Sequence, residues 1–289
     1  MAHLGSTDLR TIEWGEADAP NVALLVHGLT GRAEAFEALV DKLDLAAGVS
    51  GGPWRFIAPH LRGRGASRGI SVSEGGIQEH ARDLLALMDR KGLERVVLAG
   101  HSMGAMIGVY LAAHHPERLR GLVLIDGGSD VNDQIDALLD PAIERVKGSY
   151  PSQEAYLEYL KGQPVFADRW DEHLERYFAG DVQPRDDGSW YPVTDLETVR
   201  NDREKMHGFP LSELWSRIRC PILILLSTVG LAGPKEGFIL PPDDAWRIRK
   251  TVLDSIIVEV ENTNHYDILY SAPPVTVDAM RAFLARLGG

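Results

Sequence analysis

The stretch at residues 93–115, LERVVLAGHSMGAMIGVYLAAHH, joins two apolar runs through a short turn that contains Ser102. The first run, at 95–101, predicts a strand buried on both faces, and the second predicts a helix that continues until Pro116 breaks it. The turn at 100–104 reads GHSMG and matches the pattern G-x-S-x-G. Its glycines leave room for a sharp bend that pushes the Ser102 hydroxyl out at the carboxyl end of the strand. Because the following helix begins with unpaired N–H groups, this position is suited to stabilising an oxyanion.

The first half of the chain contains three more short apolar runs, at residues 22–28, 54–60 and 121–127. Between the strand runs, the segments 34–45 and 77–93 repeat apolar residues at helical spacing. Strands that alternate with helices predict a parallel sheet covered on both faces, because the crossover helices must pack on it. The sequence therefore predicts an α/β protein.

This alternation stops at about residue 130, and helical pieces then follow one another between Pro and Gly breaks. Two further strand patterns and a closing helical pattern come later, at 220–228, 254–262 and 273–289. The simplest organisation is one core domain, formed by residues 1–129 and 211–289, with a mainly helical insertion at 130–210.

The composition is that of a folded globular protein, since 44% of the 289 residues are hydrophobic and 25% are charged. The formal charge of −12 argues against a nucleic-acid partner, because a surface that follows phosphates needs a basic footprint. A neutral or weakly cationic small molecule suits this charge better. The single cysteine, Cys220, excludes an internal disulfide and indicates a reducing compartment.

No apolar run approaches the length of a membrane span, and the N-terminus lacks a basic region followed by a hydrophobic one. We therefore expect a cytoplasmic protein without a membrane partner. The chain has no H-E-x-x-H pattern for a metal, and Gly63, Gly65 and Gly69 lack the G-x-G-x-x-G spacing of a dinucleotide site. The sequence predicts neither a metal nor an organic cofactor.

Two distant motifs complement the GHSMG turn. The tripeptide HGL at 27–29 ends the first strong strand pattern, and His265, in NTNHYDIL, follows the last one. With these motifs the chain resembles the α/β-hydrolase family over nearly its whole length. The run APHLRGRGASRG at 58–69 is also similar to the D-x-R-G-x-G-x-S stretch of such hydrolases, with His60 in place of the aspartate.

The resemblance implies an α/β-hydrolase fold and a role for each motif. Ser102 would be the nucleophile and His265 the general base that takes its proton. The backbone N–H groups of Leu29 and Met103 would form the oxyanion hole. The insertion at 130–210 would form a helical cap over the nucleophile.

The carboxylate that should orient the histidine is missing from its usual place. Most relatives carry it shortly after the strand that here reads CPILILLS, where this chain has glycine. Asp126, in LVLIDGG, ends the next predicted strand after the one that precedes Ser102, so it should lie at the same edge of the sheet as Ser102. Some α/β-hydrolases carry their acid at this position. An aspartate there could instead cap the following turn. In order of preference, the candidate acids are Asp126, Glu236, and then Asp243 or Asp244.

These features predict a cofactor-independent serine hydrolase that cleaves a small hydrophobic ester or lactone through an acyl-enzyme. Two alternatives would use the same site: a carbon–carbon bond hydrolase for ring-cleavage products, and a perhydrolase or cofactor-free haloperoxidase. A non-enzymatic alternative is a ligand receptor that keeps hydrolase residues and signals by cap movement. Aromatic cap walls would favour a hydrophobic substrate, although we expect more than half of the cap's rings to pack its own small core. The larger aromatic residues of the cap are Tyr150, Tyr156, Tyr159, Phe166, Trp170, Tyr177, Phe178, Trp190 and Tyr191.

Overall fold

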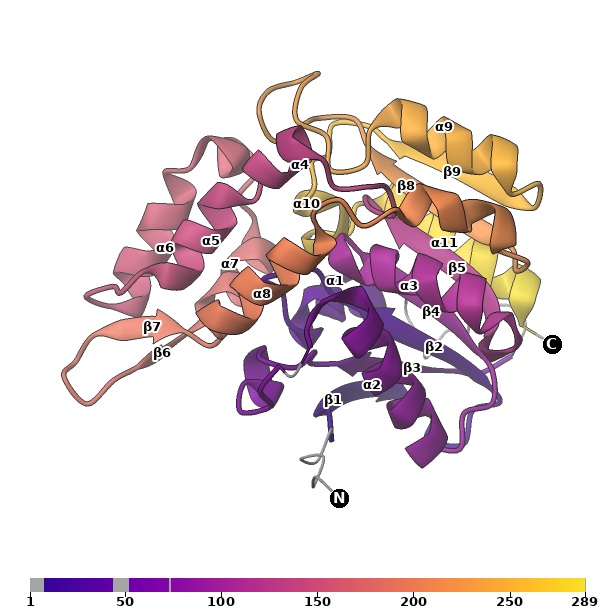
Figure 1. The fold of residues 1–289 in the computed structure, drawn as a ribbon. Coiled ribbons are helices and arrows are strands. Elements are labelled where there is room, and N and C mark those ends of the chain that lie inside the picture. Colours follow the sequence, from indigo (N-terminus) through magenta and orange to yellow (C-terminus); the bar gives the residue numbers. More distant parts are fainter. Residues whose placement is uncertain (1–7, 44–51, 73, 289) are drawn as a thin grey trace.

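The computed structural model describes residues 8–43, 52–72 and 74–288 (Figure 1). Seven strands form its main sheet: β1 (Thr11–Gly15), β2 (Asn21–Val26), β3 (Trp54–Pro59), β4 (Val96–His101), β5 (Leu119–Ile125), β8 (Ile222–Ser227) and β9 (Ser255–Val260). Their order is β1-β3-β2-β4-β5-β8-β9, with β1 antiparallel to β3 and the other neighbours parallel. The predicted α/β fold with a mostly parallel sheet is confirmed.

Six of these strands lie where the sequence predicts buried strands, and β1 is an addition. It has five residues, lies at the sheet edge and is partly exposed along its length. An edge strand covered on one side needs no continuous apolar run, so β1 leaves little trace in the sequence.

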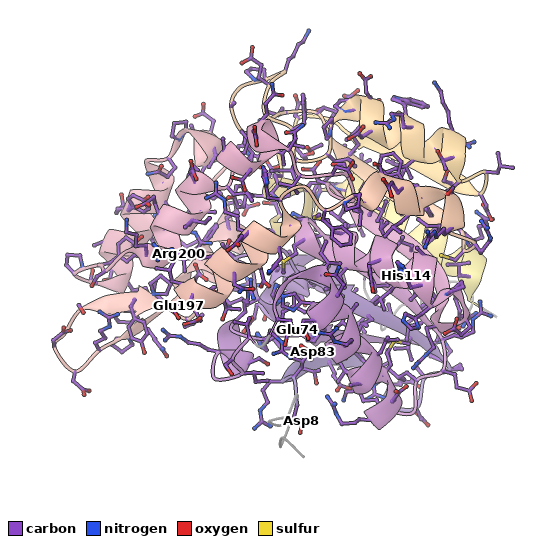
Figure 2. All side chains as sticks on the ribbon, viewed as in Figure 1. Asp8, Glu74, Asp83, His114, Glu197 and Arg200 are labelled. Atoms are coloured by element: carbon purple, nitrogen blue, oxygen red, sulfur yellow. The ribbon has the colours of Figure 1, made fainter. Side chains whose placement is uncertain are left out.

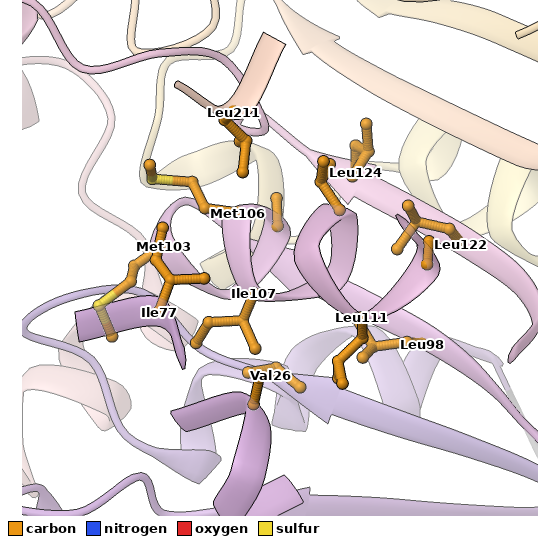
Figure 3. Packing of buried hydrophobic residues seen from close by; sticks show 14 of the residues in the cluster. Val26, Ile77, Leu98, Met103, Met106, Ile107, Leu111, Leu122, Leu124 and Leu211 are labelled. Carbon is orange, nitrogen blue, oxygen red and sulfur yellow. The ribbon is translucent and has the colours of Figure 1, made fainter. Parts of the chain in front are cut away.

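Helices cover both faces of the sheet. On one face lie α2 (Gly76–Arg90), α3 (Met103–His114) and α9 (Pro242–Thr251), and on the other lie α1 (Glu37–Leu43), α10 (Asp267–Tyr270) and α11 (Pro274–Leu287). In β2, Val26 faces the first layer and Leu25 faces the second. Figure 3 shows Ile107 and Leu111 of α3 directed at Val26 and at Leu98 of β4. Because both faces are covered, the central strands contain long apolar runs, such as residues 22–26 in β2 and 122–125 in β5.

The chain between β5 and β8, which we call the inserted segment (residues 130–210), forms a group of short elements. These are α4 (Asp133–Ala137), α5 (Asp140–Lys147), α6 (Gln153–Lys161), α7 (Glu172–Ala179), β6 (Val182–Pro184), β7 (Trp190–Pro192) and α8 (Leu196–Met206). Figure 1 shows α5, α6, α7 and the β6–β7 hairpin together at the side of the sheet domain. Within this group, α8 packs on α2 and α7 packs on α10, so the segment contacts helices from both layers.

The β6–β7 hairpin differs from the mainly helical segment that the sequence predicts. Each of its strands has only three residues, and the loop RDDGS between them carries the exposed Asp186 and Asp187. Gly188 in this loop has φ 84°, which favours glycine. Strands this short contain no apolar run by which a sequence pattern could reveal them.

Candidate active site

Ser102 lies in the turn between β4 and α3, with φ 56° and ψ −120°, a strained conformation for a residue with a side chain. The glycines around it allow strand and helix to approach closely. A Cβ atom at Gly100 would lie 2.2 Å from the carbonyl oxygen of Gly104, and one at Gly104 would lie 2.0 Å from that of Val26. The G-x-S-x-G pattern therefore reflects a steric requirement of this turn.

Asp126 and His265 lie at the same edge of the sheet as Ser102. Asp126 directly follows β5, and His265 lies in the loop after β9. His265 Nδ1 lies 2.7 Å from Asp126 Oδ2, and both side chains are buried. His265 also lines the same cavity as Ser102. Because Nδ1 is bonded to the carboxylate, Nε2 is the nitrogen left to exchange a proton within this cavity.

Ser227, the last residue of β8, holds the other carboxylate oxygen of Asp126. Its hydroxyl donates to Asp126 Oδ1 at 2.7 Å, and its backbone N–H donates at 3.2 Å. Burial alone would raise the pKa of Asp126, but the bonds from His265 and Ser227 outweigh it and lower this pKa. Asp126 is therefore ionised at neutral pH and can stabilise a charged His265.

The structure does not bring the other candidate acids to His265. Glu236 is exposed in the loop between β8 and α9, and Asp243 is exposed in the first turn of α9. Asp244 pairs with Arg247 at 2.9 Å. In the part of the chain that the structure describes, Asp126 is the carboxylate that contacts the imidazole of His265.

Leu29 and Met103, whose backbone N–H groups are the expected oxyanion donors, each share a cavity wall with Ser102. Leu29 and Ser102 line one cavity, and Met103 and Ser102 line a second. Gly28 approaches the serine so closely that a Cβ atom there would lie 3.4 Å from Ser102 Oγ. Among the described residues neither N–H group has a protein acceptor, so both can donate to a bound oxygen.

Two buried side chains fix the backbone around Leu29. His27 Nε2 accepts from the Leu61 N–H at 3.0 Å, so its Nδ1 carries the proton and donates to the Gly28 carbonyl at 2.9 Å. Burial holds the pKa of His27 well below its usual range, so the ring stays neutral. Arg64 Nε donates to the Leu29 carbonyl at 2.9 Å. The two peptides on either side of the Leu29 Cα are thus anchored, as an oxyanion donor requires.

His101 supports the loop that carries His265. Its Nε2 donates to the carbonyl oxygen of His265 at 2.8 Å, and the two rings stack with centroids 4.5 Å apart. Burial, together with the neighbouring His265, lowers the pKa of His101 to about 3. His101 is therefore neutral at working pH, and it holds the backbone of His265 in place.

Two cavities meet at Ser102, and they share Leu139 and Ile239 in their walls. The first, which we call the His265 lobe, encloses about 410 Å³ including space open to solvent; its lining includes Leu29, Thr30, Ala142, His265, Tyr266 and Tyr270. The second, the methionine lobe, encloses about 300 Å³ on the same basis; its lining includes Met103, Met106, Ser129, Val131, Ile135 and Met206.

The inserted segment contributes aliphatic rather than aromatic walls to these lobes. Leu138, Leu139 and Ala142 line the His265 lobe, and no phenylalanine, tryptophan or tyrosine of the inserted segment lies among the described lining residues. Many of these rings pack against one another, as Phe166 and Phe178 do with centroids 5.2 Å apart. The aromatic side chains that do line the site come from the loop after β9 and from α10.

A buried ionic cluster ties the inserted segment to the loop after β2. Arg145 of α5 donates to Thr30 Oγ1 at 2.9 Å and also pairs with Asp181. Arg32 Nε lies 3.9 Å from the second oxygen of Asp181. Burial alone would lower the pKa of Arg145, but Asp181 and nearby tyrosines raise it well above its usual value. Since Thr30 lines the His265 lobe, this cluster fixes one wall of the site.

The described residues contain no group of three or more His, Cys, Asp or Glu side chains arranged to hold a metal ion. The adjacent His114 and His115 do not form such a group, and His114 is exposed at the end of α3 (Figure 2). Its Nδ1 lies 3.0 Å from the carbonyl oxygen of Tyr110. None of the helices in the described ranges is both long and apolar enough to cross a bilayer.

A family model described as "alpha/beta hydrolase fold" matches residues 21–270, so the chain belongs to the alpha/beta hydrolase fold family. Over 207 residues it is 28% identical to a protein of Caulobacter sp. (strain K31) provisionally named carbamate hydrolase RutD, covering 66% of this chain and 73% of that protein.

Solved structures show the same fold at lower identity. A thermophilic esterase from Thermogutta terrifontis, solved with malate bound, has a TM-score of 0.72 at 21% identity, over 97% of this chain and 94% of that one. An enol-lactonase from Burkholderia xenovorans LB400 has a TM-score of 0.69 at 19% identity, over 96% and 95%. These likenesses concern the fold.

Sequence reasoning did not identify Ser227 or His101 as part of the site. Ser227 gives a weak signal, because it is a polar residue at the carboxyl end of an apolar strand, where parallel strands place their functional groups. His101 occupies a variable position of G-x-S-x-G, so the motif assigns it nothing. Its role depends on contact with a residue 164 positions away.

Proposed function

We propose that this protein is a serine hydrolase that cleaves a small hydrophobic carboxylic ester or lactone through an acyl-enzyme. The observation that carries the proposal is the bond between His265 Nδ1 and Asp126 Oδ2, beside a strained Ser102 at the same sheet edge. This is the arrangement of a nucleophile, a base and an acid that orients the base. The names of the relatives, an esterase, an enol-lactonase and a carbamate hydrolase, support attack on a carbonyl.

In the acylation step, Ser102 Oγ attacks the carbonyl carbon while His265 Nε2 takes the hydroxyl proton. The Leu29 and Met103 N–H groups stabilise the negative charge on the carbonyl oxygen. Asp126 stabilises the imidazolium formed on His265. The carbon–oxygen bond to the alcohol then breaks, and His265 gives its proton to the leaving oxygen.

In the deacylation step, a water molecule loses a proton to His265 and attacks the acyl carbon. The acid is released and Ser102 regains its proton, so that no cofactor is consumed. We further propose that the inserted segment acts as a cap. Its residues Ile135, Leu139 and Met206 line the lobes around Ser102, which supports a role in enclosing substrate.

A panel of p-nitrophenyl esters and of aliphatic and aromatic lactones tests the proposal. We expect turnover by wild type and loss of it in Ser102→Ala, with unchanged thermal stability. Ser216→Ala, at an exposed serine in η5 (Leu211–Arg217), is the matched control and should retain wild-type rates. Absence of wild-type turnover across the panel, or full activity in Ser102→Ala, contradicts the proposal. Slow single turnover with a ligand-dependent protein partner would favour a receptor instead.

A further inference from the structure

The two lobes around Ser102 differ in one respect that bears on how a substrate is oriented. His265 lines the first lobe and does not appear among the described residues that line the methionine lobe. Ser102 lies in the wall of both. A substrate whose carbonyl carbon is bound at Ser102 can therefore extend one group into each lobe.

The proton that His265 takes from Ser102 must go to the leaving oxygen, so this oxygen must lie on the side of His265. Since His265 Nδ1 is bonded to Asp126, the proton is carried by Nε2 within the His265 lobe. The acyl group stays attached to Ser102 after the alcohol has left. We propose that the acyl group occupies the methionine lobe and the leaving alcohol occupies the His265 lobe, which rests on the proposed ester hydrolysis.

The chemistry of the methionine lobe defines the acyl group. Met103, Met106 and Met206 supply flexible thioether side chains, which adapt to apolar groups of irregular shape. Ser129 is the polar side chain there besides Ser102 among the described residues, and its hydroxyl donates to the Ile239 carbonyl at 3.3 Å. The lobe thus suits a hydrocarbon chain.

Charge excludes one class of ester. Among the described residues that line the two lobes there is no lysine, arginine, aspartate or glutamate. A carboxylate on the acyl group would lose its hydration without gaining a cationic partner. The substrate class is therefore an ester of an uncharged, apolar carboxylic acid.

The test compares two ester series in wild type and in variants of each lobe. One series keeps p-nitrophenol as the leaving group and lengthens the acyl chain from acetate to octanoate. The other keeps acetate and enlarges the alcohol from methyl to benzyl and naphthyl. Ile135→Phe and Met106→Phe fill the methionine lobe from α4 and α3, and Ala142→Phe, the matched variant, fills the His265 lobe from α5.

In wild type we expect kcat/KM to rise by up to about fourfold for each methylene of the acyl chain that is buried. Ile135→Phe and Met106→Phe should lower the octanoate-to-acetate ratio at least about tenfold and leave the alcohol series nearly unchanged. Ala142→Phe should do the reverse. Two variants of the methionine lobe are used, so that a folding defect in one leaves the other to decide.

The charge argument has its own comparison, between p-nitrophenyl pentanoate and the p-nitrophenyl monoester of succinic acid. We expect the succinate ester to react at least about 100-fold more slowly. The inference is overturned if the two p-nitrophenyl esters react at comparable rates. It is also overturned if the variants of the two lobes affect the opposite series, or if they change neither the acyl-chain ratio nor the alcohol ratio. Each of these outcomes leaves wild type an esterase. A wild type inactive on every ester overturns the proposed function itself.

Discussion

His265 Nδ1 lies 2.7 Å from Asp126 Oδ2, although the two residues are 139 positions apart in the chain. The bond exists because β5 and β9 both belong to one parallel sheet, with β8 between them, and the residues that follow them emerge at the same edge. Ser227 at the end of β8 lies between them in the sheet order and fixes the second oxygen of the carboxylate. Three strands thus contribute to the orientation of one imidazole.

Replacing this carboxylate tests its role directly. Asp126→Asn should lower kcat by about 10³- to 10⁴-fold. The uncharged amide cannot stabilise the imidazolium, and it favours the tautomer of His265 that cannot accept the Ser102 proton. Esterase assays on the folded variant measure the loss. Glu236→Gln, at an exposed carboxylate without contact to His265 in the described chain, should keep wild-type rates. Near wild-type activity in Asp126→Asn would falsify its assignment as the acid.

The burial of His101 predicts a specific dependence of stability on pH. Its pKa falls from an ordinary value of 6.5 to about 3 in the folded protein. Between these values the unfolded chain binds a proton that the folded chain does not, so stability decreases as pH falls. This one group should contribute a slope of up to about 1.4 kcal/mol per pH unit, and the slope fades as the pH rises past 6.5.

His101→Gln keeps an N–H donor for the His265 carbonyl and removes the titrating group. Urea unfolding at several pH values between 4 and 6.5 gives the slope of the free energy of unfolding against pH. In His101→Gln this slope should be smaller than in wild type by the contribution of about one proton. An unchanged slope in His101→Gln would mean that His101 is not held neutral.

The ionic cluster of the inserted segment should be sensitive to loss of its carboxylate. Asp181 is fully buried and contacts Arg145, Arg32 and the hydroxyl of Tyr156. Asp181→Asn leaves the buried guanidinium group of Arg145 without its counter-charge, whereas Arg32 keeps Glu34 at 2.8 Å. This change should lower the free energy of unfolding by about 3–5 kcal/mol. Chemical denaturation measures this loss. Asp187→Asn, in the exposed hairpin loop, should change it by less than about 0.5 kcal/mol.

Close packing of the turn around Ser102 predicts opposite results for two glycines. In Gly104→Ala the new methyl group would lie 2.0 Å from the Val26 carbonyl oxygen, so β2 and α3 must separate and the protein should lose both stability and activity. Gly69→Ala places its methyl group where no atom lies within 4 Å, and it should be neutral. Thermal unfolding and ester hydrolysis of both variants provide the comparison. Equal stability of the two variants would contradict the steric account.

The sequence predicted Ser102, His265 and the HGL loop because their motifs are local: each lies at a strand end, and each pattern fits within a few residues. Asp126 could be ranked above Glu236 from its place at a strand end, but the contact with His265 that separates the two is not recorded in the sequence. The composition of the inserted segment did not tell which of its aromatic rings, if any, line the site. Many of those rings pack together, and shorter side chains such as Leu139 and Ala142 reach the site instead.

The sequence by itself determined the alternation of strands and helices and the steric pattern of the GHSMG turn, because both depend on neighbours in the chain. The tertiary structure decided which carboxylate meets His265, which side chains hold Asp126 and His101, and how the cavity divides at Ser102. These relationships join residues more than 100 positions apart. They depend on the order of strands in the sheet and on the packing of the inserted segment, neither of which a local pattern encodes.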